Sequence, residues 1–154
     1  MKTRAISLLE KMGVGYEVLN YKHDVKGAKY AADSLGADIK QMIKSLVIKD
    51  NNNCFYFCLM PGHLEVSVKK AAKLLNVKSA AMATSEEAER LTGYFVGGIS
   101  PFGSKNELKV IIDSSLILHE QIYINGGARG VILKMKFSDL QKTLEPLSGD
   151  IAAE

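Results

Sequence analysis

The feature that most constrains this chain is a pair of short apolar runs separated by a four-residue polar segment. Residues 42–49 are rich in β-branched and apolar side chains, and residues 50–53 read Asp-Asn-Asn-Asn. Residues 54–60 form the second run, which ends at Pro61-Gly62. Two β-type runs joined by such turn residues predict an antiparallel hairpin. The fold must therefore be built around paired short strands.

Further short elements lie on both sides of this hairpin. The spacing of apolar residues, with capping and stop signals, predicts helices over residues 6–12, 28–35, 68–75 and 85–91. A last helix is expected from Ser138, which forms a capping-box pattern with Gln141. Strands are expected at residues 16–21, 80–83, 108–113, 121–124 and 131–136. Strands outnumber helices and hairpins imply antiparallel pairing. We therefore expect an α/β fold with a mixed, mostly antiparallel, barrel-like sheet and surrounding helices.

The composition is that of one globular domain spanning residues 1–154. The chain has 47% hydrophobic and 24% charged residues, and a chain of this length buries roughly 69% of the surface that its unfolded form exposes. A core can therefore form without metal or disulfide cross-links. No apolar run approaches the ~20 residues of a membrane helix, and the N-terminal stretch lacks the features of a secretory signal. We expect neither a membrane protein nor a disulfide scaffold.

The two cysteines, Cys54 and Cys58, favour a reducing compartment. On one strand they would lie about 13 Å apart at ~3.3 Å per residue, whereas a disulfide needs Cα atoms within about 7 Å. We expect buried free thiols and a cytoplasmic location.

The charge of the chain is only weakly informative. The net charge is +3, and the excess lies in residues 1–50, which carry nine basic and six acidic side chains. Such a bias is compatible with an anionic partner such as RNA, but a solvated surface is its more common meaning.

Common catalytic motifs are missing from the sequence. There is no P-loop, no GxGxxG, no GxSxG and no HExxH. The three histidines, His23, His63 and His119, are far apart, and none is paired with a cysteine at zinc-ligand spacing. We therefore expect no metal site and no Ser-His-Asp arrangement.

Lys44 is unusual because it lies inside the apolar run MIKSLVI. On a strand it would share a face with Met42, Leu46 and Ile48, where an unpaired ammonium group is costly. A functional lysine is one interpretation, and an edge lysine that discourages aggregation is the other.

Two other segments are unusual for a pure scaffold. Residues 21–24, Tyr-Lys-His-Asp, place two ring side chains and a carboxylate at an expected strand end, although an ordinary turn uses the same residue types. Residues 93–103 contain four glycines and a proline, which cost chain entropy unless the backbone shape matters. Glycine lets main-chain N–H groups approach a ligand, as an oxyanion or phosphate site requires. A structural loop is the alternative.

Five segments in this order make the chain resemble the YbaK/EbsC family: YKHD, the lysine of MIKSLVIK, LTGYFVGGISPFG, KVIID and GGARG. The resemblance extends from about residue 3 to about residue 151. It implies a YbaK-like fold and aminoacyl-tRNA editing, as in the insertion domain of bacterial prolyl-tRNA synthetase. The YbaK type hydrolyses cysteine attached in error to proline tRNA, and related branches remove alanine or other residues.

The resemblance also implies roles for individual residues. Lys44 matches the functional lysine, Ser45 takes the place of its hydroxyl neighbour, and Tyr21 and Tyr30 match pocket aromatics. The backbone wall of the site corresponds to Gly97, Gly98, Ile99 and Ser100. One departure is Ile132, which stands where some relatives have an acidic residue.

The implied reaction needs no cofactor. In YbaK-like enzymes the thiol of the misattached cysteine attacks its own ester and gives a cyclic thioester, which would explain the missing triad. The implied partners are the acceptor end of a mischarged tRNA and prolyl-tRNA synthetase, with no DNA and no membrane. Two alternatives stay open: a deacylase for alanine or another small residue that activates water, and a non-catalytic module that binds tRNA or the synthetase.

Overall fold

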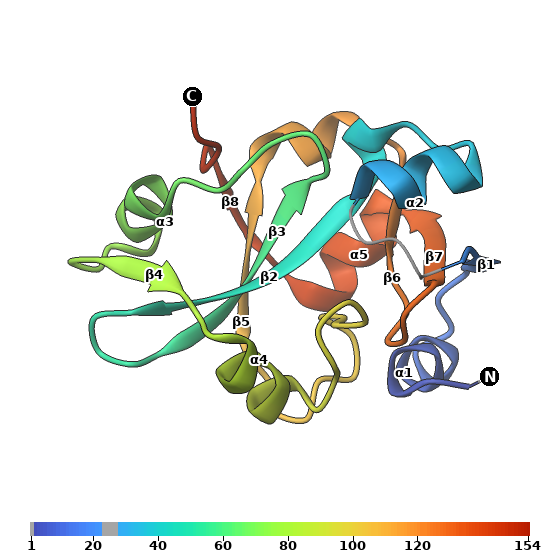
Figure 1. The fold of residues 1–154 in the computed structure, drawn as a ribbon, viewed down its shortest axis with the longest axis horizontal. Coiled ribbons are helices and arrows are strands. Elements are labelled where there is room, and N and C mark those ends of the chain that lie inside the picture. Colours follow the sequence, from blue (N-terminus) through green and yellow to red (C-terminus); the bar gives the residue numbers. More distant parts are fainter. Residues whose placement is uncertain (1, 23–27) are drawn as a thin grey trace.

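The computed structural model describes residues 2–22 and 28–154 (Figure 1). The helices are α1 (Arg4–Lys11), α2 (Ala28–Leu35), α3 (Val68–Leu75), α4 (Ser85–Thr92) and α5 (Phe137–Leu144), with 3-10 turns η1 (Ile39–Gln41) and η2 (Ser114–Leu118). The strands are β1 (Glu17–Asn20), β2 (Ile43–Asp50), β3 (Phe55–Pro61), β4 (Ala80–Met82), β5 (Lys109–Asp113), β6 (Gln121–Asn125), β7 (Val131–Lys136) and β8 (Leu147–Gly149).

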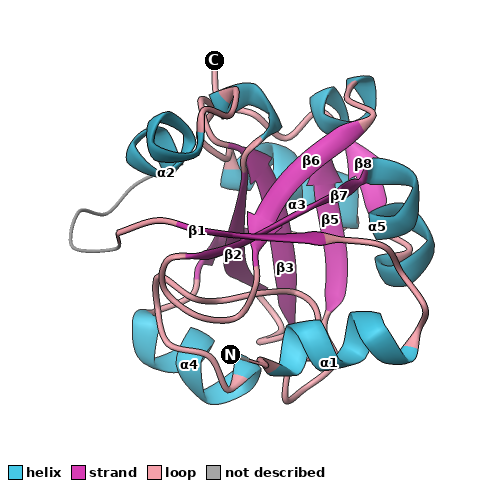
Figure 2. Ribbon diagram, turned by 90° about the vertical axis from the view of Figure 1, so that its right-hand side faces the viewer, coloured by secondary structure: helices cyan, strands magenta, loops and turns pink. Residues whose placement is uncertain are grey.

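The strands form two sheets. The five-stranded sheet has the order β4-β2-β3-β5-β8, antiparallel between β4, β2 and β3 and parallel between β3, β5 and β8. The three-stranded antiparallel sheet has the order β1-β7-β6, and Figure 2 shows it in front of β2, β3 and β5. A single parallel bridge between Met42 and Tyr123 joins the two sheets. The mixed, mostly antiparallel α/β fold is thus confirmed, although the sheets stay open and resemble a barrel only loosely.

The central strand β2 contributes side chains to two separate cores. Ile43 and Val47 belong to the main core, which also receives residues of β3, β6, β7, α1 and α5. Ile48 belongs to a second core beneath α3. This alternation agrees with the faces predicted from the sequence, since successive side chains of a strand point to opposite sides.

The hairpin turn is fixed by the buried carboxylate of Asp50. It accepts hydrogen bonds from the N–H groups of Asn52 (2.8 Å) and Cys54 (3.0 Å) and from the Tyr56 hydroxyl (2.6 Å). These bonds, with that of Tyr56 first, hold the pKa of Asp50 below its usual value. The polar turn of the sequence therefore sets the register of β2 against β3.

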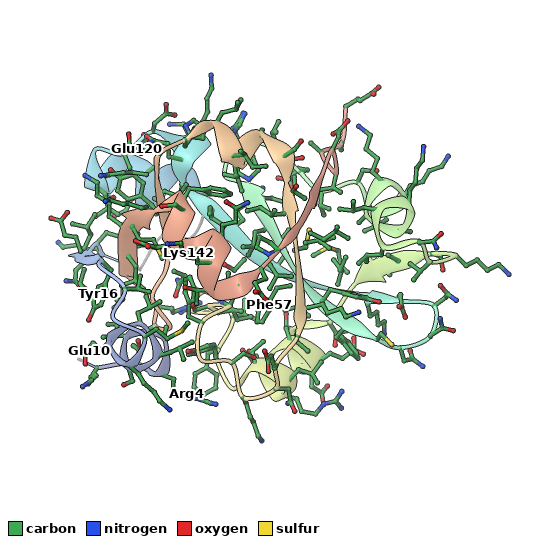
Figure 3. The ribbon with its side chains drawn as sticks, turned by 180° about the vertical axis from the view of Figure 1, so that it is seen from behind. Arg4, Glu10, Tyr16, Phe57, Glu120 and Lys142 are labelled. Atoms are coloured by element: carbon green, nitrogen blue, oxygen red, sulfur yellow. The ribbon has the colours of Figure 1, made fainter. Side chains whose placement is uncertain are left out.

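Near the N-terminus, α1 is tied to the chain that follows it. The Glu10 carboxylate pairs with Lys2 at 2.7 Å and accepts a hydrogen bond from the Tyr16 hydroxyl at 3.1 Å (Figure 3). The end of α1 is thereby held beside the start of the three-stranded sheet.

Two local expectations are wrong. The last helix begins at Phe137, and Ser138 is not its cap. Phe137 is buried, and its N–H donates to the Glu120 carbonyl at 2.8 Å, so the helix start is fixed by tertiary packing. Cys54 is exposed instead of buried, whereas Cys58 is buried and desolvation raises its pKa to about 12. No helix among the described residues is long and apolar enough to cross a membrane.

Candidate active site

A cavity of about 400 Å³ lies beside β2, where the two sheets separate. It is bounded by β2 itself, by the segment that leads from β4 into α4, by the glycine-rich loop after α4, and by the turn between β6 and β7. The lining residues used below are Tyr21, Lys44, Ser45, Met82, Val96, Gly97, Ile99, Asn125, Arg129 and Ile132.

The cavity exposes a free edge of β2. On this edge β4 is paired with β2 from Ile48 onward, and the bridge to β6 is at Met42. The Val47 carbonyl accepts a hydrogen bond from Ala83 N–H at 3.0 Å. Because alternate residues of a strand direct both backbone groups to the same side, the N–H and C=O of Ser45 also point to this edge. No described strand is paired with Ser45 there, so its main-chain groups are available to a ligand.

The side chain of Ser45 also lacks a described partner. Its hydroxyl oxygen is buried and has no hydrogen-bond partner within the described part of the chain. Buried polar groups are nearly always hydrogen-bonded in native proteins. A rotation of this side chain toward the cavity would let a polar group of a ligand satisfy the hydroxyl.

Lys44 lines the same cavity and makes one ionic contact with a described residue. Its side chain is 20% exposed, and Nζ lies 3.1 Å from the carboxylate of Glu65, which is 84% exposed. A pair with so exposed a partner contributes only ~0–1 kcal/mol, because water competes for both charges. The ammonium can therefore exchange Glu65 for an anionic ligand at little cost.

The glycine-rich loop supplies one wall, but fewer free amides than the resemblance implies. Gly97 and Ile99 line the cavity, whereas Gly98 and Ser100 are buried behind it. The Gly98 N–H donates to the Phe95 carbonyl at 2.8 Å, and the Ser100 hydroxyl accepts from Phe102 N–H at 3.2 Å. Gly98 and Ser100 therefore shape the loop from within.

Close packing explains why glycines occur here. Gly97 has a φ of +95°, and a Cβ on it would lie 2.7 Å from Nε of Arg129. A Cβ on Gly98 would meet the backbone of Ala128 at 3.0 Å. The Asn125 side chain also donates to the Gly97 carbonyl at 3.0 Å. The loop is thus fitted against the turn between β6 and β7.

Of the two aromatic residues assigned to the pocket by the resemblance, only Tyr21 lines the cavity. Its ring lies edge-on to that of Tyr30, with centroids 6.2 Å apart; Tyr30 itself is not in the lining. Burial raises the pKa of Tyr21, and the charge of Arg129 partly opposes the rise. Tyr21 is therefore a neutral hydrogen-bond donor at physiological pH. His23 and Asp24 of the same motif lie outside the described residues.

Arg129 and Asn125 are site residues that the motifs did not single out. Arg129 is exposed, lines the cavity and makes no ion pair with a described carboxylate. The GGARG turn could have pointed to Arg129, because an arginine in a glycine-rich turn can pack against a second loop. Ile132, the departure from the family pattern, is buried and adds an apolar wall.

The chemistry available in this cavity is limited. Its described lining offers two cations, hydroxyl groups and main-chain groups, but no carboxylate, imidazole or thiol. Among the described residues, no group of three histidine, cysteine or acidic side chains could hold a metal ion. These described groups can bind and polarise an anionic or ester group.

Solved structures share this fold over nearly the whole chain. A candidate trans-editing enzyme for prolyl-tRNA synthetase aligns with a TM-score of 0.89 and 27% sequence identity, covering 98% of this chain and 96% of the other. The hypothetical protein APE2540 aligns with the same TM-score at 21% identity, which supports the fold alone.

Sequence relatives agree with the structural match. EbsC of Enterococcus faecalis, a candidate Cys-tRNA(Pro)/Cys-tRNA(Cys) deacylase, is 29% identical over 136 residues, which cover 87% of this chain and 83% of EbsC. The proline–tRNA ligase of Fervidobacterium nodosum is 33% identical over 107 residues, but these are only 18% of the ligase. The model of the aminoacyl-tRNA editing domain matches residues 22–143. The chain therefore belongs to the aminoacyl-tRNA editing domain family, as its motifs suggested.

Proposed function

We propose that this protein removes a misattached amino acid from tRNA and that its main substrate is Cys-tRNA(Pro). The observation that carries the proposal is the cavity beside β2, which brings cations and main-chain donors together without an acid, base or thiol in its described lining. Its relation to EbsC and to a segment of prolyl-tRNA ligases supports the choice of tRNA.

A second, hydrolytic site is needed because binding energy alone cannot give a synthetase sufficient selectivity. A synthetase pocket for proline rejects a side chain of similar size poorly, because one methylene group is worth only ~1–3 kcal/mol. An error must therefore be removed after it has been made. The aminoacyl ester is already reactive, so orientation and charge stabilisation can supply much of the catalysis.

The residues of this site have different roles in binding the substrate. Lys44 and Arg129 bind the terminal phosphate or the developing oxyanion, and the N–H and hydroxyl of Ser45 hold the ester. Tyr21 and Ile132 shape the small side-chain pocket, with Tyr30 behind Tyr21.

The reaction then uses the substrate's own sulfur. The cysteine thiol attacks the ester carbonyl, the bond to the ribose oxygen breaks, and the proton of the thiol passes to that oxygen. The products are free tRNA and a cyclic thioester, which water opens to cysteine. The protein contributes position and positive charge.

A panel of proline tRNAs charged with cysteine, serine or alanine tests this function. Serine differs from cysteine only in the attacking atom, so we expect rapid release of cysteine and slow release of the other two. Faster release of alanine would favour attack by activated water. Binding of all three without release would favour a non-catalytic module.

We also propose that residues 1–154 act as one editing domain beside prolyl-tRNA synthetase in the cytoplasm, where tRNA is charged. Joint sedimentation of the protein with purified synthetase and tRNA would reveal such a complex. Separate sedimentation at micromolar concentrations would contradict it.

A further inference from the structure

The glycine-rich loop carries an exposed aromatic ring. Phe95 is 80% exposed, and it is the only aromatic among the large apolar side chains exposed in residues 2–22 and 28–154. The preceding residue, Tyr94, is buried, and its hydroxyl donates to the Phe102 carbonyl at 2.7 Å. A single exposed apolar side chain needs no explanation by itself, so the surroundings of Phe95 decide its meaning.

The backbone beneath this ring is held rigidly. The Phe95 carbonyl accepts the Gly98 N–H at 2.8 Å, and the Val96 N–H donates to the Glu89 carboxylate at 2.8 Å. The next residue, Gly97, is tied to Asn125 at 3.0 Å. A fixed backbone lowers the entropy that a ligand must remove on binding. Phe95 is thus presented on a preformed support.

The support lies at the mouth of the cavity. Val96 and Met82 are both exposed, and both line the cavity from different elements. The side chain of Arg129 packs against Gly97. The mouth therefore combines apolar surface with a cation beside the loop that carries Phe95.

We propose that Phe95 is a stacking platform for a nucleobase of the RNA end whose ester enters the cavity. This inference rests on the proposed function. Each nucleotide joins a flat π surface to a phosphate, and proteins that bind single strands combine aromatic stacking with positive charge. A protein partner fits less well, because a stable protein interface buries about 1,200–2,000 Å². Among the described residues, the large apolar side chains exposed near this mouth are those of Phe95, Val96 and Met82.

The chain offers a direct spectroscopic test because it contains no tryptophan. Phe95→Trp places a single indole on the loop, and Leu118→Trp places one on η2, where Leu118 is 83% exposed and outside the cavity lining. The probe is an unacylated RNA hairpin with a single-stranded ACCA 3′ end. We expect saturable quenching of Trp fluorescence in the Phe95→Trp variant and none in the Leu118→Trp variant.

Affinity provides the second measurement. Phe95→Ala is expected to weaken binding of the hairpin about 5- to 150-fold, the effect of losing one stacked base, while Phe95→Trp binds like the wild type. Lack of quenching at position 95, or unchanged affinity after Phe95→Ala, would overturn the inference. A fluorescence change that requires added synthetase would make the ring a protein contact and would also overturn it.

The test separates this inference from the proposed function. The probe carries no amino acid, so quenching does not depend on hydrolysis. Quenching by a protein that releases no amino acid from charged tRNA would support the stacking platform and contradict the deacylase.

Discussion

In the proposed reaction, catalysis depends most on the ammonium group of Lys44. Lys44→Ala is expected to lower the rate of Cys-tRNA(Pro) deacylation about 10²- to 10³-fold, the effect of removing one oxyanion donor. Thermal stability should hardly change, because the contact with exposed Glu65 contributes only ~0–1 kcal/mol. Single-turnover rates and melting temperatures check both expectations.

The matched control for Lys44 is its own partner. Glu65→Gln removes the negative charge at 3.1 Å but keeps the ammonium, so deacylation should be retained. Equal loss of activity in both variants would mean that the ion pair, not the free cation, is needed.

The buried hydroxyl of Ser45 should lower the stability of the free protein. It is buried without a described hydrogen-bond partner, and such a group costs about 1–3 kcal/mol. Ser45→Ala should therefore leave the free energy of unfolding unchanged or raise it by up to about 1 kcal/mol, while KM for charged tRNA rises. Urea unfolding and steady-state kinetics measure the two effects.

Ser100 is the comparison for Ser45, since its hydroxyl accepts the Phe102 N–H at 3.2 Å. Ser100→Ala should lower the free energy of unfolding by about 1 kcal/mol, the net worth of one hydrogen bond. If Ser45→Ala destabilises the protein as much as Ser100→Ala does, the Ser45 hydroxyl has a hydrogen-bond partner in solution and is not available to the substrate.

The glycine-rich loop depends on a backbone conformation that residues other than glycine rarely adopt. Gly97 has a φ of +95°, and a methyl group there would lie 2.7 Å from the Arg129 side chain. Gly97→Ala should lower the free energy of unfolding by about 1–3 kcal/mol through backbone strain, and it should reduce deacylation because Arg129 must move. Gly15→Ala is the control, since a Cβ there meets nothing within 4 Å. Similar melting temperatures for the two variants would show that the loop tolerates rearrangement.

The elements that were predictable are those governed by local chemistry. The helix expected at residues 85–91 begins with a capping box of Thr84 and Glu87, and the polar turn expected after residue 49 is held by Asp50. Both are made by residues a few positions apart. The start of α5 was not predictable, since the Phe137 N–H is satisfied by Glu120, a residue from another segment. Strand β8 was missed because it is short and pairs with the distant strand β5.

In the folded molecule, five residues named from the motifs come together, although the motifs did not predict the geometry of the cavity. Tyr21, Lys44, Ser45, Gly97 and Ile99 line one cavity. The free edge of β2 could not be foreseen, because it results from the distance between β4 and β6 and not from any residue in β2. The same is true of Arg129, whose position depends on two loops meeting.

The positive charge of Arg129 should make the affinity for RNA depend more steeply on salt. RNA binding that neutralises phosphates weakens with salt, with a slope of log K against log salt of about −0.7 per contact for single strands. If Arg129 holds one phosphate at the cavity mouth, Arg129→Gln should reduce the magnitude of this slope by about 0.7. The measurement is the affinity of the ACCA hairpin between low and physiological salt.

Lys142 lies on α5 (Figure 3), which contributes no described residue to the cavity lining. Lys142→Gln therefore controls for the loss of one positive charge. Its salt slope should equal that of the wild type. Equal slopes for all three proteins would mean that Arg129 contacts no phosphate, and equal reductions in both variants would mean that RNA responds to total charge alone. Only a reduction confined to Arg129→Gln fits an RNA end held at one fixed position, as the proposed function requires.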